Sequence, residues 1–352
     1  SLGDPGSGPG TLTVVSLPIR EPVTPSAQVD VKADPLGPPG AVAISPDGRF
    51  AFVAQADDAG DTVAIVDLRA TPPRVGQQAF VGQSPRGVAI NPSGDLLAVV
   101  TRQPGAPLVM LPITPGAATP AGEALAWPLS RLRDESAVAS SVQWHPSGRM
   151  LAITLPQSDE VAFFAVNRGE EGAIEVALAA PPPTVGPTPL HAAFAQDGRV
   201  VVCLCASRDA GGAMPISAGQ LCAVAVPDLP PRWERKGELL GPSPRVIGRA
   251  DLPPGPVGLA ISPGGREVAA VCISGADGTP GRGGTLSVFA LERSGEMSLK
   301  AQTSLGAVPA GVAFDATGRF VLVSQYGSLD PEAAAGEVSF WRLGARTLTQ
   351  QD

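Results

Sequence analysis

The stretch Gly40-Ala-Val-Ala-Ile-Ser-Pro-Asp-Gly-Arg-Phe50 decides the fold, because the chain repeats its pattern five more times. Each copy runs from a small residue through an apolar strand to a tight turn that ends in glycine, and then into a second apolar strand. The turn glycines are Gly48, Gly94, Gly148, Gly198, Gly265 and Gly318, which follow one another at intervals of 46 to 67 residues. A repeat of this length made only of short strands is typical of a β-propeller, in which each repeat forms one blade. The sequence therefore predicts an all-β propeller.

Each repeat contains enough strands for a four-stranded antiparallel blade. In the turn at residues 45–48, Pro46 presets φ, Asp47 caps the turn and Gly48 takes the left-handed corner, so that the first two strands (a and b) form a hairpin. A third strand (c) follows with clearer alternation, for example at 62–67. A weaker outer strand (d), for example at 174–178, completes the blade and forms its exposed edge.

The number of blades depends on the N-terminal segment. The chain has six a–b pairs but seven c strands, since TLTVVSL at 11–17 matches TLSVFAL at 285–291, and 28–32 then serves as the d strand. We therefore expect seven blades, the first without its a–b pair in this chain. The alternative is six blades, with the N-terminal strands completing the last one. The expected organisation is a flexible N-terminus at 1–10, one propeller domain at 11–343 and a C-terminal tail at 344–352. Its units start near 11, 40, 87, 141, 191, 258 and 311.

Composition narrows the classes of partner. The 352 residues carry a formal net charge of −8, and the acidic residues are spread along the chain without a basic stripe. Nucleic acid and anionic membranes are therefore not expected as partners. No apolar run approaches the 18 or so residues of a membrane span. We expect a soluble, monomeric protein, in the cytoplasm or the periplasm.

The phrases at 39–49 (PGAVAISPDGR) and 84–94 (SPRGVAINPSG) resemble the repeat of lactonase-type and YVTN-type seven-bladed propellers, and the resemblance extends over about residues 11–343. Enzymes of this group, such as 6-phosphogluconolactonase, work at the mouth of the central channel with His, Arg and Glu side chains. Their phrase Pro-Arg-His-aliphatic-Ala-Phe precedes a turn and a strand that ends in Asn-Glu. Here the matching stretch keeps the histidine as His191 but has Leu190 in place of the arginine and Cys205-Ala206 in place of Asn-Glu. The catalytic signature is largely missing.

His191 is one of two histidines and occupies a column otherwise filled by alanine, glycine and serine. The functional interpretation makes it a general base at the channel mouth, with Arg86 or Arg208 holding a carboxylate or phosphate. The structural interpretation is a histidine bonded to a backbone carbonyl of the neighbouring blade. Both remain open at the level of sequence.

Other polar residues fall on the face built by the b–c loops. The candidates for ligand binding are Gln143, Arg102, Asp209, Gln325 and Tyr326. We expect a module that binds a small molecule or a protein there without catalysis and without a cofactor. The alternative is a lactone hydrolase with His191 as its base, so enzymatic activity stays open.

Three of the four cysteines, Cys203, Cys205 and Cys222, belong to the blade of His191. Three thiols and an imidazole offer zinc ligands, but no Cys-x2-Cys spacing is present and a flat sheet closes badly around a tetrahedral ion. The expectation is therefore buried free thiols and no metal, with a Cys203–Cys222 disulfide as an alternative in an oxidising compartment. Cys272 is predicted to lie in the core.

Overall fold

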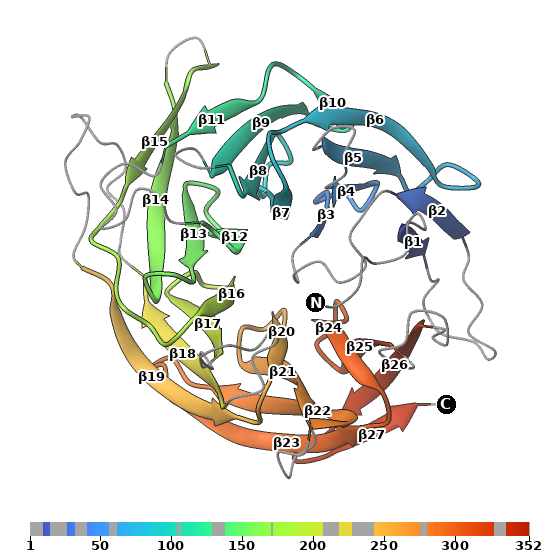
Figure 1. Ribbon diagram of the computed structural model, residues 1–352, viewed down its shortest axis with the longest axis vertical. Coiled ribbons are helices and arrows are strands. Elements are labelled where there is room, and N and C mark those ends of the chain that lie inside the picture. Colours follow the sequence, from blue (N-terminus) through green and yellow to red (C-terminus); the bar gives the residue numbers. More distant parts are fainter. Residues whose placement is uncertain are drawn as a thin grey trace. The chain divides into compact units, whose positions relative to one another are not determined.

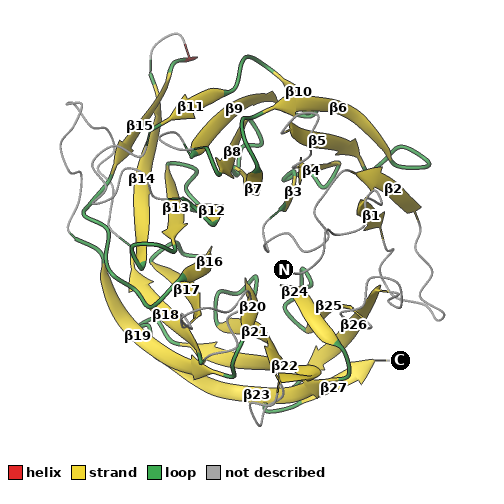
Figure 2. Cartoon of the chain, viewed as in Figure 1, coloured by secondary structure: helices red, strands yellow, loops and turns green. Residues whose placement is uncertain are grey.

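A computed structural model describes residues 10–14, 27–31, 41–55, 62–103, 107–128, 138–169, 172–206, 218–226, 243–274, 280–326 and 336–351. The chain divides into two compact units, Ser7–Gly148 and Arg149–Asp352, and the boundary falls in the turn after one a strand. Each unit is described by itself. Within the described residues the secondary structure consists of β-strands joined by turns and loops, without an α-helix (Figure 2).

The strands of the first unit follow the predicted order of a, b, c and d in each repeat. They are β1 (Gly10–Val14), β2 (Ala27–Val31), β3 (Val42–Ile44), β4 (Phe50–Gln55), β5 (Thr62–Asp67), β6 (Arg74–Phe80), β7 (Pro85–Ile90), β8 (Leu96–Thr101), β9 (Leu108–Thr114), β10 (Thr119–Pro120), β11 (Leu125–Trp127) and β12 (Ser141–Trp144).

The second unit continues the same order (Figure 1). Its strands are β13 (Met150–Leu155), β14 (Glu160–Arg168), β15 (Ile174–Leu178), β16 (Pro189–Phe194), β17 (Val200–Ala206), β18 (Gly219–Ala225), β19 (Arg245–Leu252), β20 (Pro256–Ile261), β21 (Glu267–Ser274), β22 (Pro280–Leu291), β23 (Met297–Leu305), β24 (Val308–Phe314), β25 (Phe320–Tyr326), β26 (Gly336–Leu343) and β27 (Leu348–Gln351).

The sheets confirm the prediction of four-stranded antiparallel blades. Among the described residues, five sheets have four strands in chain order, starting at β3, β12, β16, β20 and β24. The sheet of β7, β8 and β9 has five strands, because β10 and β11 are short and both pair with β9. The strands β1 and β2 form a two-stranded sheet of their own, as expected for a first blade without its a–b pair.

The turn glycines adopt the predicted conformation. Gly48 has a φ of 66°, and its N–H donates to the carbonyl of Ser45 at 2.8 Å. The equivalent glycines of the other five repeats also have positive φ, between 69° and 74°. Because a left-handed φ costs glycine little, each repeat closes its a–b hairpin at the same point. The register of strands a and b is therefore fixed by the turn.

Successive sheets of a unit pack face to face. In the first unit, β4 and β5 pack against β7, β8 and β9, and Val29 of β2 packs on Val53 and Val66 of the sheet that follows. In the second unit, apolar clusters join the sheet of β16 to β14 on one face and to β20–β23 on the other, and a further cluster joins β21–β23 to the last sheet. Because successive side chains point to opposite faces of a strand, both faces of a sheet contribute residues to an apolar core.

The C-terminal boundary needs a correction. Residues 344–352, expected as a tail, include β27, which pairs with β26 from Phe340↔Gln351 to Leu343↔Leu348 and forms the d strand of the last sheet. That sheet therefore contains its four strands without β1 or β2, which argues against the six-blade alternative. The part of the chain that the structure describes has no helix long and apolar enough to cross a bilayer.

Candidate functional site

His191 lies on β16 and is buried, with 7% of its surface exposed. Its ring donates a hydrogen bond to the backbone carbonyl of Leu259, on β20 of the neighbouring sheet. Burial lowers the pKa of His191 to about 4, and the hydrogen bond opposes this only in part. The imidazole is therefore neutral near pH 7 and forms the contact that the structural interpretation requires.

The register of the sheet separates His191 from the cysteines. On β17, Leu204 pairs with His191 and Cys203 pairs with Ala192. Since successive residues point to opposite faces, His191 shares a face with Leu204, while the thiols lie on the other face with Ala192. Cys203, Cys205 and Cys222 belong to the cluster that packs against β14, whereas Leu204 belongs to the cluster that faces β20–β23.

This geometry disagrees with a zinc site made of three thiols and His191. Among the described residues, no group of three or more His, Cys, Asp or Glu side chains is placed to hold a metal ion. All four cysteines are free and buried.

Four a strands begin with the same backbone irregularity. A β-bulge follows the first proline of β7, β16, β20 and β24, and the proline itself pairs with a residue at the end of strand b. The residues paired in this way are Thr101, Cys205, Cys272 and Gln325. The four sheets therefore offer one backbone position whose side chain changes from sheet to sheet. In the sheet of His191 it is a buried thiol, followed by a buried Ala206.

Arg86 and Arg102 lie at the same end of one sheet. Arg86 is the bulged residue between Pro85 and Gly87, and Pro85 pairs with Thr101, which precedes Arg102. The N–H of Arg102 donates to the carbonyls of Gln83 and Ser84, at 3.0 and 3.2 Å. Arg86 is half-buried and Arg102 is exposed.

Gln143 is a half-buried residue of β12. It lies in the first unit, with Arg86 and Arg102, whereas His191 and Gln325 belong to the second. Arg208 and Asp209 fall outside the described residues, so their predicted roles stay predictions.

Gln325 is one of the four strand b residues that pair with the first proline of a strand a, and its side chain belongs to a network of hydrogen bonds. Its side-chain amide donates to Glu337 Oε1 at 3.1 Å and to Ser339 Oγ at 2.8 Å, and the residue is 4% exposed. Trp341 Nε1 donates to the same Ser339 Oγ at 2.9 Å. Within the described chain, Gln325 Oε1 is buried and has no hydrogen-bond partner. Tyr326 ends β25 next to this group, and its side chain is outside the described residues.

Sequence reasoning missed Glu337 and Ser339. They stand on strand c with period-two spacing, opposite Gln325 and Val323 respectively. The polar alternation Glu-Val-Ser at 337–339 was the available signal.

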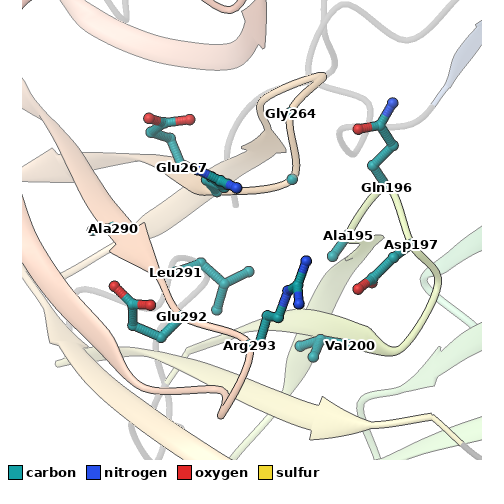
Figure 3. Close-up of a pocket in the computed structure, with 12 residues that line it drawn as sticks. Ala195, Gln196, Asp197, Val200, Gly264, Glu267, Ala290, Leu291, Glu292 and Arg293 are labelled. Atoms are coloured by element: carbon teal, nitrogen blue, oxygen red, sulfur yellow. The ribbon is translucent and has the colours of Figure 1, made fainter.

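A cavity of about 700 Å³ opens at the opposite strand ends, beside the a–b turns of two adjacent sheets (Figure 3). Its charged lining comes from Asp197, Arg266, Glu267, Glu292 and Arg293. Glu267 is already engaged, because Oε2 accepts from Ser262 Oγ at 2.7 Å and Oε1 lies 3.1 Å from Lys300 Nζ. Binding was predicted at the b–c loops, so this cavity was not predicted, although charged residues recur in these turns.

Comparison with known proteins agrees with the fold. Residues 22–110 match the family model described as "Lactonase, 7-bladed beta-propeller". No curated protein matches the chain.

Several solved structures are similar over nearly the whole chain. The periplasmic gluconolactonase PpgL of Pseudomonas aeruginosa is 19% identical, with a TM-score of 0.62 over 89% of this chain and 84% of that one. A putative 6-phosphogluconolactonase of Bacteroides uniformis is 15% identical, with a TM-score of 0.59 over 88% and 83%. A protein of unknown function from Desulfotomaculum acetoxidans is 14% identical, with a TM-score of 0.60 over 92% and 86%. At these identities the likeness is one of fold: the chain is a lactonase-like β-propeller.

Proposed function

We propose that this lactonase-like propeller is a non-catalytic module that binds a small polar molecule or a protein at its b–c loop ends. The observation that carries the proposal is the position of His191, which is buried and hydrogen-bonded to the carbonyl of Leu259. A general base must reach the proton that it removes and have a pKa near the working pH. An imidazole held in the interior with a pKa of about 4 meets neither requirement.

The neighbours of His191 support the same interpretation. The bulge position before it holds Leu190, and the end of the paired strand holds Cys205 and Ala206, both fully buried. None of these three side chains supplies a charge to orient a substrate or stabilise an oxyanion. Of these four described side chains, only His191 could therefore take part in a hydrolytic reaction at this sheet.

Binding has better support than chemistry at the same strand ends. The exposed Glu337 carboxylate, which accepts a hydrogen bond from the Gln325 amide, is an acceptor to which a ligand hydroxyl or amide can donate. In the other unit, Arg86 and Arg102 provide donors for a carboxylate or phosphate. Taken separately, the first set of groups fits a ligand that bears hydroxyls and the second fits an acidic ligand, and the similar structures include proteins described as a gluconolactonase and a putative 6-phosphogluconolactonase.

The test combines a turnover assay with a binding assay on the full chain. Acid release from glucono-δ-lactone and 6-phosphogluconolactone is followed in a pH-stat, and thermal shift is measured with gluconate, 6-phosphogluconate and sugar phosphates. We expect a ligand-dependent rise in Tm without acid release above the uncatalysed rate, because a ligand that binds only the folded state stabilises it. Arg102→Gln should reduce the shift, and Arg245→Gln, which alters an exposed arginine of β19, should not.

A lactone hydrolase with His191 as its base is the second candidate, favoured by the position of His191 in the family phrase. Acid release that disappears in His191→Gln and persists in His145→Gln would establish it and overturn the proposal. The absence of both turnover and any thermal shift would overturn binding of this ligand class as well.

A further inference from the structure

The sheet of β16–β19 carries a group of reactive side chains that the proposed function does not use. Cys203, Cys222 and Arg249 form one row across β17, β18 and β19, since Cys203 pairs with Cys222 and Cys222 pairs with Arg249. The next row on the same face contains Cys205 and Gln220. Side chains of both rows point to the same side of the sheet because the rows are two residues apart.

Arg249 is fixed over the sulfur of Cys222. Its Nη1 donates to Cys222 Sγ at 3.1 Å and to Gln220 Oε1 at 2.6 Å. Cys222 Sγ is also within reach of two acceptors, Gln220 Oε1 at 3.4 Å and the carbonyl of Val185 at 3.5 Å. Cys222 itself is buried, and the arginine that donates to its sulfur is an exposed residue.

The sulfur of Cys205 lies beside that of Cys222. The Cys205 thiol donates a hydrogen bond to Cys222. Gly186 provides an independent measure, because a Cβ added there would lie 3.1 Å from Cys205 Sγ and 3.3 Å from Cys222 Sγ. The two sulfurs therefore approach the same point, and the missing side chain of Gly186 leaves room for both.

The two thiols are chemically unequal. The hydrogen bond from Cys205 and the charge of Arg249 lower the pKa of Cys222 against the effect of its burial. The same hydrogen bond, and then burial, raise the pKa of Cys205. Burial also raises the pKa of Cys203, and charge repulsion from Cys222 raises it further; in contrast to Cys205, Cys203 interacts with Cys222 through charge and not through a hydrogen bond. The thiolate that attacks and the thiol that supplies a proton are thus different residues.

We propose that Cys205 and Cys222 are a redox-active dithiol, in which Cys222 reacts with a hydroperoxide and Cys205 then closes an intramolecular disulfide. In the first step the Cys222 thiolate attacks the O–O bond of hydrogen peroxide, which gives Cys222 sulfenic acid and hydroxide; this hydroxide takes a proton from solvent to become water. In the second step the Cys205 sulfur attacks the sulfenic sulfur, the S–O bond breaks, and a second water leaves with the Cys205 proton. Two thiols lose two electrons and one peroxide becomes two waters.

The experiment counts thiols in the full chain before and after exposure to hydrogen peroxide. Denatured protein should contain four free thiols before treatment and two afterwards, with peptide mapping placing the new bond between Cys205 and Cys222. Cys203 and Cys205 lie on one tryptic peptide, so Cys203→Ser assigns the bond: this matched control should still lose two thiols. Cys205→Ser should lose none to a disulfide and should accumulate a dimedone-reactive sulfenic acid at Cys222.

Arg249→Gln tests the role of the arginine. At an assay pH below the pKa of Cys222, each unit by which that pKa rises cuts the thiolate fraction about tenfold and raises its nucleophilicity about threefold, so oxidation should slow by about threefold per unit. Four thiols remaining after treatment, or a bond through Cys203, would overturn the proposal. An unchanged oxidation rate in Arg249→Gln would overturn the role given to Arg249. A chymotryptic digest of the wild type, which cleaves after Leu204 and so separates Cys203 from Cys205, assigns the pairing without depending on whether a cysteine variant folds.

Discussion

Mild acid should destabilise the protein through His191. The folded state holds this histidine neutral with a pKa of about 4, whereas an unfolded histidine has a pKa of about 6.5. Between these values the unfolded chain binds a proton that the folded chain does not, so the free energy of unfolding falls as the pH falls. Lowering the pH from 7.5 to 5 should remove about 2 kcal/mol, and the full loss below pH 4 should approach about 3 kcal/mol.

Urea unfolding at pH 7.5, 6.5, 5.5 and 5 measures this loss, in wild type and in His191→Gln. Glutamine keeps a donor for the carbonyl of Leu259 but cannot titrate, so the wild type should lose about 2 kcal/mol more than the variant over this range. Most carboxylates stay ionised down to pH 5, and their contribution is common to both proteins. His145→Gln is the matched control, because His145 bonds Ser147 in its own turn and this variant should keep the His191-dependent loss. Equal pH dependence in wild type and His191→Gln would refute the assignment of an interior, neutral imidazole.

Two further predictions concern packing and charge. Gly248→Ala should destabilise the protein by more than about 2 kcal/mol, because the new Cβ would overlap the carbonyl oxygen of Gly295. Gly264→Ala is the control: its Cβ would enter open space, so it should cost less than about 1 kcal/mol. Urea unfolding compares the free energies of unfolding of the two variants. Lys300→Met should change stability by at most about 1 kcal/mol, because its partner Glu267 and the lysine itself are partly exposed, and the difference should shrink in 0.5 M salt. A larger, salt-independent loss in Lys300→Met would contradict this.

The repeat predicted the fold because its hairpins are closed by local chemistry. The glycine of each a–b turn takes positive φ and sets the register, so the strand order follows from a pattern readable in eleven residues. The strand β27 was missed because its sequence, Leu348-Thr-Gln-Gln, lacks an apolar alternation; its two middle residues are exposed and its two end residues are half-buried. An edge strand is held by backbone pairing with β26 and needs little from its side chains.

The side-chain arrangement around His191 was partly predictable. Counting outward from the turn, where the N–H of Ala195 donates to the carbonyl of Val200, places His191 opposite Leu204 and on the face away from the cysteines. The diagonal approach of Cys205 to Cys222 could not be predicted. It depends on Gly186, which lies in the loop between β15 and β16 and not in a strand of the sheet. The burial of Gln325 Oε1 likewise could not be predicted, because the sequence pattern does not specify how far the end of a strand is covered by its neighbours.

The strand b residue that pairs with the first proline of strand a recurs at the end of four sheets. One backbone geometry, a proline followed by a bulge, presents Thr101, Cys205, Cys272 and Gln325 at equivalent positions, so the side chain at this position differs from one strand end to the next. In the sheet of His191 this side chain is a buried thiol, and the next residue, Ala206, is buried with its N–H bonded to the carbonyl of Thr188. A carboxylate at residue 206 would be buried, and an unpaired buried charge is strongly unfavourable. The interior position of His191 and the apolar strand end are therefore two parts of one packed arrangement in this sheet.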